Sequence, residues 1–212
     1  QYDRLSEGAR ESAQDYDWYR IIPQYIECYE DAVSHNRRSK KDIEVSIVIT
    51  CHNLAAYIEE AVNSALQQDF SLPYEIIIVD DLSTDGSRDI LKRIRKEHPN
   101  LKLIFNKKNL KAGPSRNEGI KKAKGKYIVC LDGDDTIEPN FLTELHKTID
   151  SDRSIGIAYS GFKLFGADHG VLGAAKWDFE RLKRGNFLPC CNMFRKVAWE
   201  RCGGYKNINP SW

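Results

Sequence analysis

From Glu44 onward, short runs of β-branched apolar residues alternate with segments of helical periodicity. This alternation is typical of βαβ units, whose strands form a mostly parallel sheet with helices on both faces. Strands are predicted at Val45–Thr50, Tyr74–Asp80 and Leu101–Phe105, and in the apolar run that begins at Lys126. The sequence therefore predicts an α/β fold with a Rossmann-like, mostly parallel sheet flanked by helices.

Three helices are expected between these strands. The first has one apolar face, formed by Leu54, Ile58, Ala61, Val62, Ala65 and Leu66. The second carries Ile90, Leu91 and Ile94, has N-cap candidates in residues 83–87 and ends near His98. The third begins at Gly113-Pro114, because proline is tolerated in a first helical turn, and runs to Gly125, which suits a C-terminal cap.

Composition and charge restrict the class of protein. A chain of 212 residues with 41% hydrophobic and 30% charged residues can bury the core of one principal domain. The formal net charge of +1 gives no overall field to attract nucleic acid or an anionic membrane, so any anionic partner must be bound locally. No apolar run is long enough to span a bilayer. We expect a cytoplasmic protein without nucleic-acid partners, either free or peripheral at the inner face of the membrane.

The ends and the cysteines add further expectations. Residues 1–42 are predicted to be an N-terminal helical extension, with a helix after Pro23 and a basic linker at 36–41. The chain starts without Met and stops at Trp212, so we expect a fragment. Its six cysteines form no Cys-x-x-Cys pair, and two of them, Cys51 and Cys130, fall in predicted core strands. Disulfides and a zinc site are therefore not expected.

A cluster of carboxylates follows the fourth predicted strand. Asp132, Asp134 and Asp135 lie within four residues of one another. Carboxylates this close raise one another's pKa unless a cation neutralises them, and oxygen ligands favour Mg²⁺ or Mn²⁺. The cluster therefore indicates a metal site formed by these three aspartates, and the alternative is an Asp/Gly-rich turn after a strand.

Polar residues follow the other strands as well. They are Thr50, His52 and Asn53 after the first strand, Asp80 and Asp81 after the second, and Asn106, Lys107, Lys108 and Asn109 after the third. In an open parallel sheet, ligands bind at the carboxyl ends of the strands. Together with the helix that begins at Gly113 and with Arg116, such an edge can hold a metal and a phosphate, as a nucleoside diphosphate requires. Asp81 can accept hydrogen bonds from the base or ribose. Alternatively, His52 binds nothing and Arg116 only pairs with Glu118 or Asp85.

The chain resembles the family 2 glycosyltransferases, which have the GT-A fold. The family's motifs occur in order as Val45-Ser-Ile-Val-Ile-Thr-Cys-His-Asn53, Val79-Asp-Asp-Leu-Ser-Thr-Asp85, Gly113-Pro-Ser-Arg-Asn-Glu-Gly119 and the Asp-x-Asp motif Asp132-Gly-Asp134. The third of these has one residue fewer before the arginine than the family's Gly-x-x-x-Arg-Asn-x-Gly. The sequence departs from the family at His52, where Tyr is common, and at Leu82, where Gly or another small or polar residue is common.

The resemblance implies a site and a reaction. The implied nucleotide-binding residues are Thr50, His52, Asn53, Asp81, Arg116 and Asp132, and the implied ligands of Mn²⁺ or Mg²⁺ are Asp132, Asp134 and Asp135. The implied reaction is metal-assisted transfer of a hexosyl or hexosaminyl group, with inversion, from a nucleotide sugar to a hydroxyl of a saccharide or lipid-linked acceptor. UDP is the preferred donor nucleotide, and the biosynthesis of cell-envelope polysaccharide is the expected context.

The same resemblance divides the chain at Asp135. Residues 43–135 are expected to form the nucleotide-sugar-binding half, and residues 136–212 an incomplete, mixed acceptor-side half with a further strand at 155–160 and a turn at Gly203-Gly-Tyr205. In the family an acidic pair after this turn supplies the catalytic base. No Asp or Glu follows Glu200, so the base is expected beyond Trp212.

Two other functions fit parts of the sequence. A non-catalytic nucleotide-sugar-binding module would have the same donor motifs. A phosphatase of the haloacid dehalogenase type would use Asp132 as a nucleophile in an Asp-x-Asp-x-Thr motif. That motif normally opens its domain, whereas three predicted strands precede it here.

Overall fold

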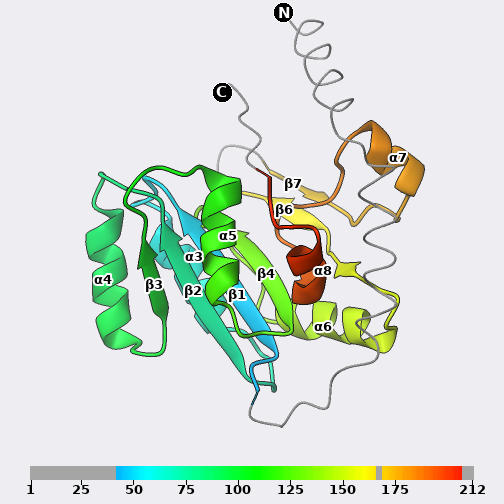
Figure 1. Cartoon of the computed structure of the whole chain (residues 1–212), viewed down its shortest axis with the longest axis horizontal. Coiled ribbons are helices and arrows are strands. Elements are labelled where there is room, and N and C mark those ends of the chain that lie inside the picture. Colours follow the sequence, from blue (N-terminus) through cyan, green and yellow to red (C-terminus); the bar gives the residue numbers. More distant parts are fainter. Residues whose placement is uncertain (1–41, 166–168, 207–212) are drawn as a thin grey trace, which may run out of the picture.

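The computed structural model describes residues 42–165 and 169–206, which form a central sheet with helices on both faces (Figure 1). Within these residues the sheet has six strands in the order β3-β2-β1-β4-β8-β5, and a separate hairpin pairs β6 with β7. The strands are β1 (Val45–Cys51), β2 (Tyr74–Asp80), β3 (Lys102–Phe105), β4 (Tyr127–Asp132), β5 (Ile157–Ala158), β6 (Phe162–Leu164), β7 (Gly170–Leu172) and β8 (Met193–Arg195). The helices are α3 (Ile58–Leu66), α4 (Ser87–Glu97), α5 (Ala112–Lys122), α6 (Phe141–Ser151), α7 (Phe179–Arg184) and α8 (Lys196–Arg201).

The sheet is parallel on one side and antiparallel on the other. Strand β1 lies between β2 and β4 and runs parallel to both, and β2 runs parallel to β3. Strand β8 is antiparallel to β4 and to β5. The predicted α/β fold, with a mostly parallel sheet and a mixed portion, is therefore confirmed.

Alternating side chains of the strands enter two cores. Ile47 and Ile49 of β1 pack with α3, α4 and α6, whereas Val48 packs on the opposite face with Ile120 of α5. Every residue of β1 is buried, as expected of a central strand covered on both faces. Cys51 and Cys130 lie inside these layers as predicted, each with 1% of its surface exposed.

The end of α5 differs from the prediction. The helix ends at Lys122, and Ala123 is already extended with φ −69° and ψ 139°, so Gly125 does not cap it. Gly125 instead passes against β1, where its N–H donates to Ser46 Oγ at 2.8 Å. A Cβ on Gly125 would lie 2.5 Å from the Ser46 backbone nitrogen. This glycine is needed for close packing between two segments.

Some expectations fall outside the described residues. These are the helix after Pro23 and the linker at 36–41, so the division of the chain at residues 42 and 135 stays a prediction.

Strand β8 belongs to the predicted acceptor-side half, yet it joins the sheet of the first half by pairing with β4. None of the helices in the described ranges has the length and hydropathy that crossing a bilayer requires.

Candidate functional site

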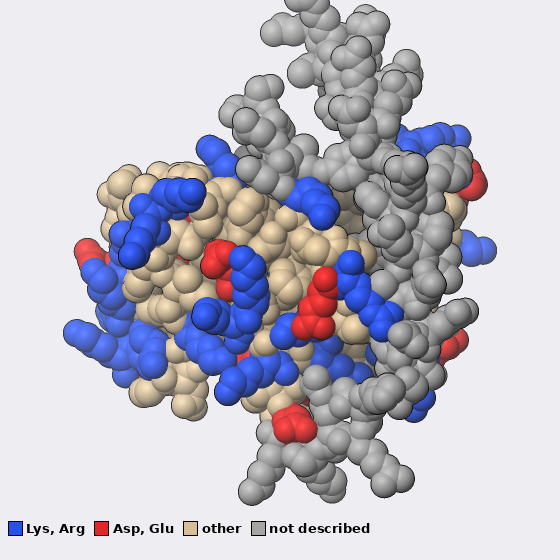
Figure 2. Space-filling view, viewed as in Figure 1, with Lys and Arg blue, Asp and Glu red and all other residues tan. Residues whose placement is uncertain are grey.

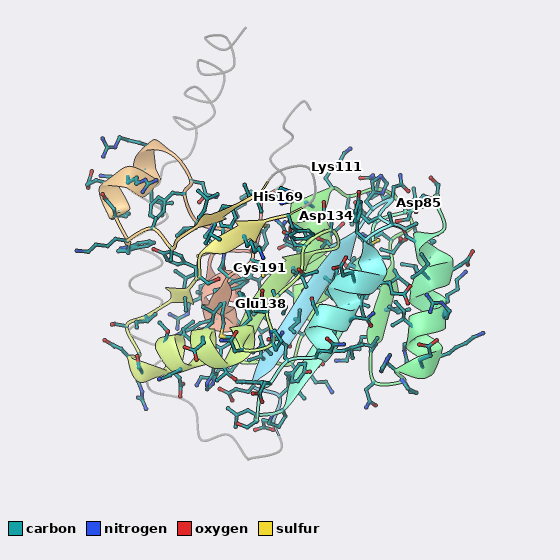
Figure 3. The ribbon with its side chains drawn as sticks, turned by 180° about the vertical axis from the view of Figure 1, so that it is seen from behind. Asp85, Lys111, Asp134, Glu138, His169 and Cys191 are labelled. Atoms are coloured by element: carbon teal, nitrogen blue, oxygen red, sulfur yellow. The ribbon has the colours of Figure 1, made fainter. Side chains whose placement is uncertain are left out.

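The predicted polar residues lie at one end of the sheet, where the parallel strands finish. Asp85, Lys111 and Asp134 mark this end in Figure 3. Thr50 of β1 is the register partner of Asp132 of β4, and its Oγ1 donates to Asp132 Oδ1 at 3.1 Å. The predicted convergence of Thr50 and Asp132 is therefore a consequence of strand order and register.

Arg116 of α5 holds Asp132. Its Nη2 lies 2.6 Å from Oδ1 and 2.9 Å from Oδ2 of the carboxylate, and the two side chains are 13% and 29% exposed. Burial alone would lower the pKa of Arg116, but the Asp132 carboxylate opposes that effect and the pKa is raised. Arg116 thus pairs with Asp132 and not with Glu118, which pairs with Lys121. The Arg116 Nε is buried and donates to no described group.

The two aspartates that follow are more open. Asp134 and Asp135 are exposed, and the turn that carries them begins at Gly133, where a Cβ would lie 2.8 Å from the Thr50 carbonyl oxygen. Burial around the carboxyl group of Asp135 and the negative charges of Asp132 and Asp134 raise its pKa. A cation bound beside these carboxylates would relieve that repulsion.

Asp81 is buried beneath the loop that joins β3 to α5. It is 3% exposed. Its Oδ1 accepts the Leu110 N–H at 2.8 Å, and its Oδ2 accepts the Lys111 N–H at 2.8 Å. Asn106 Nδ2 donates to it at 2.8 Å. Lys111 has a φ of 70° and a ψ of 171°, a conformation that is strained for a residue other than glycine. Asp81 therefore shapes this loop, and its contact with a nucleoside stays a prediction.

His52 connects the loops after β1 and β3. Its Nδ1 lies 2.7 Å from the Asp81 carbonyl oxygen, which can only accept, so Nδ1 carries the proton. The Nε2 lone pair then faces Asn109 Nδ2 at 3.1 Å. His52 is exposed but held in position by these two contacts.

Asn53 and Asp85 tie the loop after β1 to the loop after β2. Asn53 Oδ1 accepts the Thr84 N–H at 2.8 Å, and Asp85 Oδ2 accepts the Ala55 N–H at 2.8 Å. Asp85 Oδ1 also accepts the Ser87 N–H and hydroxyl at the start of α4. Asn53 thus has a structural role beside its predicted contact with the nucleotide.

Residues of the second half also reach this site, and the sequence did not identify them. Cys190 Sγ lies 2.8 Å from Arg116 Nη2. Cys190 is exposed as a residue, but the protein groups packed around its Sγ and the charge of Asp132 raise the pKa of this thiol to about 12, so it is protonated at neutral pH. Tyr205 lies beneath the Arg116 guanidinium, with 5.7 Å between Cζ and the ring centroid.

Asn117 holds the turn that contains Tyr205. Its Oδ1 accepts the Tyr205 N–H and the Trp199 Nε1–H, both at 2.9 Å, and its Nδ2 donates to the Tyr205 carbonyl oxygen at 2.8 Å. Gly204 has a φ of 77°, and a Cβ there would lie 2.8 Å from Asn117 Oδ1. The neighbouring residues Arg116 and Asn117 of α5 thus both contact the second half, and Arg116 also contacts Asp132 of the first half.

A second cluster of possible metal ligands lies elsewhere. Among the described residues, only Glu44, His146 and Asp150 place three such ligand atoms within 4.8 Å of one another. Lys126 Nζ lies 3.5 Å from Glu44 and 3.0 Å from Asp150, so one ammonium group already offsets part of the negative charge of these two carboxylates. Glu44 lies just before β1, at the opposite end of the strands from Asp132. The predicted ligands Asp132, Asp134 and Asp135 do not come within this distance of one another, so their joint binding of a metal stays a prediction.

The family model of glycosyl transferase family 2 matches residues 46–201, which is most of the chain. The chain belongs to this family. Family membership gives no support to the haloacid dehalogenase interpretation of Asp132. The family 2 chain is also similar to a Bacillus subtilis protein named as a teichuronic acid biosynthesis glycosyltransferase, TuaG. The two are 34% identical over 126 residues, which cover 58% of this chain and 48% of TuaG.

Solved structures agree with this assignment. The family 2 chain matches S. aureus TarS 1-349 in complex with UDP with a TM-score of 0.63 and 25% identity, over 77% of this chain and 50% of that one. A mannosyltransferase from Pyrobaculum calidifontis, in complex with GDP-Man and Mn²⁺, matches with a TM-score of 0.59 over 88% of this chain and 56% of that one. At 20% identity the second match shows the fold alone. The chain thus has a GT-A-type fold and spans about half the length of these relatives.

Proposed function

We propose that this chain binds a nucleotide-diphosphate sugar, with UDP as the preferred nucleotide, for transfer of a hexosyl or hexosaminyl group to an acceptor hydroxyl with inversion. The main support is the arrangement of Asp132 between Thr50 and Arg116, with exposed Asp134 and Asp135 beside it. The UDP complex of the related TarS favours UDP.

The nucleoside part of the donor is assigned to the loops after β1 and β2. Thr50, His52, Asn53 and Asp81 lie there, and the exposed imidazole of His52 offers a flat surface whose orientation two contacts fix. Aromatic rings can stack on any base, because every base has a flat π-face. We assign His52 to stacking on the base and the buried Asp81 to shaping the neighbouring loop.

The carboxylates fit a divalent cation because they supply oxygen ligands that repel one another in its absence. Asp134 and Asp135 would hold Mn²⁺ or Mg²⁺ together with Asp132, and the cation when bound supplies positive charge that stabilises the departing diphosphate. Arg116 supplies a second positive charge. Its Nε–H has no acceptor among the described residues, and we assign it to a phosphate oxygen of the bound donor.

The acceptor is assigned to the second half of the chain. Direct displacement inverts the anomeric carbon and needs a base that takes the proton of the acceptor hydroxyl. We assign no base within residues 42–165 and 169–206. A saccharide or lipid-linked acceptor of cell-envelope polysaccharide, reached from the cytoplasmic side, is consistent with the name of TuaG.

Thermal unfolding with UDP, GDP, CMP and TDP, each with and without Mn²⁺, tests the donor site. A ligand present at about a hundred times its Kd adds about 2.7 kcal/mol of stability, or several degrees in Tm. We expect a metal-dependent rise in Tm with UDP that is lost in Asp134→Ala and kept in Asp89→Ala. Asp89 is a matched control because its side chain is 83% exposed on α4.

Three results would contradict parts of the proposal. A Mn²⁺ effect that survives Asp134→Ala but disappears in His146→Ala would place the metal at the Glu44, His146 and Asp150 cluster. The absence of any metal-dependent rise with all four nucleotides would reject the donor site. Donor binding in the full-length protein without sugar transfer to any acceptor would favour a non-catalytic binding module.

A further inference from the structure

The small net charge of the chain conceals a strongly basic segment. Residues 92–126 contain 13 of the 32 Lys and Arg but only 2 of the 31 Asp and Glu, which are Glu97 and Glu118. The rest of the chain therefore has 19 basic and 29 acidic residues. Surfaces that serve solubility alone usually mix the two signs of charge. This separation indicates a local function for the positive charge.

The fold gathers this charge around the edge of the sheet that β3 forms. The segment forms the second half of α4, the edge strand β3 and α5, and Figure 2 shows Lys and Arg concentrated over these elements. We call this surface the basic face and define it by Lys92, Arg95, Lys96, Lys102, Lys121, Lys122 and Lys124. Lys107, Lys108 and Lys111 extend it toward the donor site.

Much of this charge has no ion-pair partner among residues 42–165 and 169–206. Lys92, Lys102 and Lys121 pair with Asp89, Glu75 and Glu118. Arg95, Lys96, Lys122 and Lys124 take part in none of the ion pairs among the described residues, and the last three are exposed. The basic face thus presents positive charge to an external partner.

The surface does not suit a chain-like polyanion. Phe105 is the one exposed large hydrophobic residue between positions 92 and 126, and the Arg88 guanidinium lies 5.4 Å from its ring centroid. The basic face therefore lacks the several stacking rings with which proteins hold single-stranded nucleic acid. The groove beside it, of about 650 Å³, is lined by Glu75 and Glu97 as well as by Lys102 and Lys124, so it is not a cationic channel.

We propose that the basic face docks on a bilayer surface containing anionic phospholipid. Flexible lysines distributed over two helices and an edge strand match many diffusing headgroups better than one fixed ligand. The exposed lysines Lys96, Lys122 and Lys124 of the basic face lie at the C-terminal ends of α4 and α5, where β3 and β4 begin, whereas the donor site lies at the carboxyl ends of the strands (Figures 1 and 3). Docking through these lysines therefore leaves the donor site uncovered.

Vesicle co-sedimentation of the 212-residue chain tests this proposal. The vesicles contain phosphatidylcholine alone or with about 30% phosphatidylglycerol. We expect binding only to the anionic vesicles, and weaker binding as salt screens the surface charge. The triple variant Lys96→Glu, Lys122→Glu, Lys124→Glu should bind about a hundredfold more weakly, because each lysine near an anionic bilayer contributes roughly fivefold in affinity.

The control variant has the same change in net charge on other surfaces. Lys147→Glu, Lys163→Glu, Lys176→Glu alters three exposed lysines outside the basic face and should bind anionic vesicles within a few-fold of the unmodified chain. If the first triple variant unfolds, the corresponding Lys→Gln triple replaces it. Equal losses in the two triples, or no binding of the unmodified chain at low salt, would overturn the proposal.

Two further measurements separate the alternatives. Tighter binding to soluble polyphosphate than to the anionic vesicles would identify a polyanionic chain as the partner and reject the membrane. The Tm rise with UDP and Mn²⁺ should be the same in both triples, because none of the substituted lysines lies at the donor site. The membrane proposal and the proposed function can therefore fail separately.

Discussion

The guanidinium of Arg116 contacts both carboxylate oxygens of Asp132, at 2.6 and 2.9 Å. A cation placed so close to a proposed metal ligand competes with the metal for that ligand. The arginine also provides the donor's phosphates with a positive charge. Removing the arginine should therefore have opposite effects on the binding of the metal and on the binding of the nucleotide.

Arg116→Gln should strengthen binding of Mn²⁺ alone and weaken binding of UDP with Mn²⁺ by at least about tenfold. Removing the guanidinium frees Asp132 for the metal but takes a charged donor from the diphosphate, and hydrogen bonds to charged groups contribute about 1.5–3 kcal/mol. Isothermal titration with each ligand measures both effects. Arg93→Gln, which changes an exposed arginine paired with Glu59, is the matched control. Weaker binding of Mn²⁺ alone would contradict the competition.

Asn117 should behave differently from its neighbour Arg116. It makes three hydrogen bonds to Trp199 and to the turn at Tyr205, and none to the predicted donor residues. Asn117→Ala should therefore lower the free energy of unfolding by about 1–3 kcal/mol, because buried partners lose their bonds. Affinity for UDP with Mn²⁺ should stay within a few-fold. A large loss of UDP affinity at a temperature where the variant is folded would place Asn117 in the donor site.

Leu82 has a left-handed backbone, with a φ of 64°. This conformation costs a residue with a Cβ about 1–2 kcal/mol, whereas glycine adopts it without that cost. Leu82→Gly should raise the free energy of unfolding by up to about 1 kcal/mol, since relief of strain exceeds the added entropy of the unfolded chain. Leu82→Ala keeps a Cβ and should give no gain. Equal effects of the two variants in denaturant unfolding would show that backbone strain is not the cause.

The sequence predicted the strands well because each is a buried β-branched run with polar residues at its end. The bounds of β2 agree with the prediction, and those of β1 and β3 differ by one residue. Strand β5 has only two residues, Ile157 and Ala158, because its pairing with β8 ends there. The length of this strand is set by a partner strand 35 or more residues away, so the sequence around residue 157 does not indicate it.

The sequence predicted that these polar residues gather at the carboxyl ends of the strands, but it did not predict their contacts. Thr50 and Asp132 lie close together because they lie at the ends of neighbouring parallel strands, and ligand-binding residues are expected at such strand ends. The carboxylate of Asp81 instead binds N–H groups 29 and 30 residues later, at Leu110 and Lys111. Cys190 reaches Arg116 from 74 residues away. These contacts depend on how loops fold back over the sheet, which periodicity does not report.

Gly119 lies where α5 packs tightly against the sheet. A Cβ at this position would lie 2.3 Å from Val48 Cγ1 and 3.1 Å from Val79 Cγ2. Alanine favours a helix by about 1 kcal/mol over glycine, but overpacking a core costs about 1–3 kcal/mol and cannot be relieved by these two buried valines. Gly119→Ala should therefore lower the Tm, whereas Lys122→Ala on the exposed face of α5 should not. An unchanged or higher Tm for Gly119→Ala would mean that α5 can move outward.

Glu75 gives the fold a specific dependence on pH. Burial alone would raise its pKa, but hydrogen bonds from Lys102 Nζ at 2.5 Å, the Lys124 N–H at 2.6 Å and Ser46 Oγ at 2.8 Å hold the pKa below its ordinary value of 4.5. A carboxyl group whose pKa is lower in the folded state stabilises the fold above its unfolded pKa. That stability is lost as the pH falls through 4.5 toward the lower folded value.

Glu75→Gln should therefore reduce the free energy of unfolding by about 1–3 kcal/mol at pH 7, because a charged acceptor for three donors is lost. The difference from the unmodified chain should shrink as the pH falls below 4.5, since protonation removes the same charge there. Urea unfolding between pH 7 and pH 3 measures it. Glu60→Gln, at an exposed position on α3, should have little effect at either pH. A difference that stays constant down to pH 3 would mean that Glu75 stabilises the fold by its shape and not by its charge.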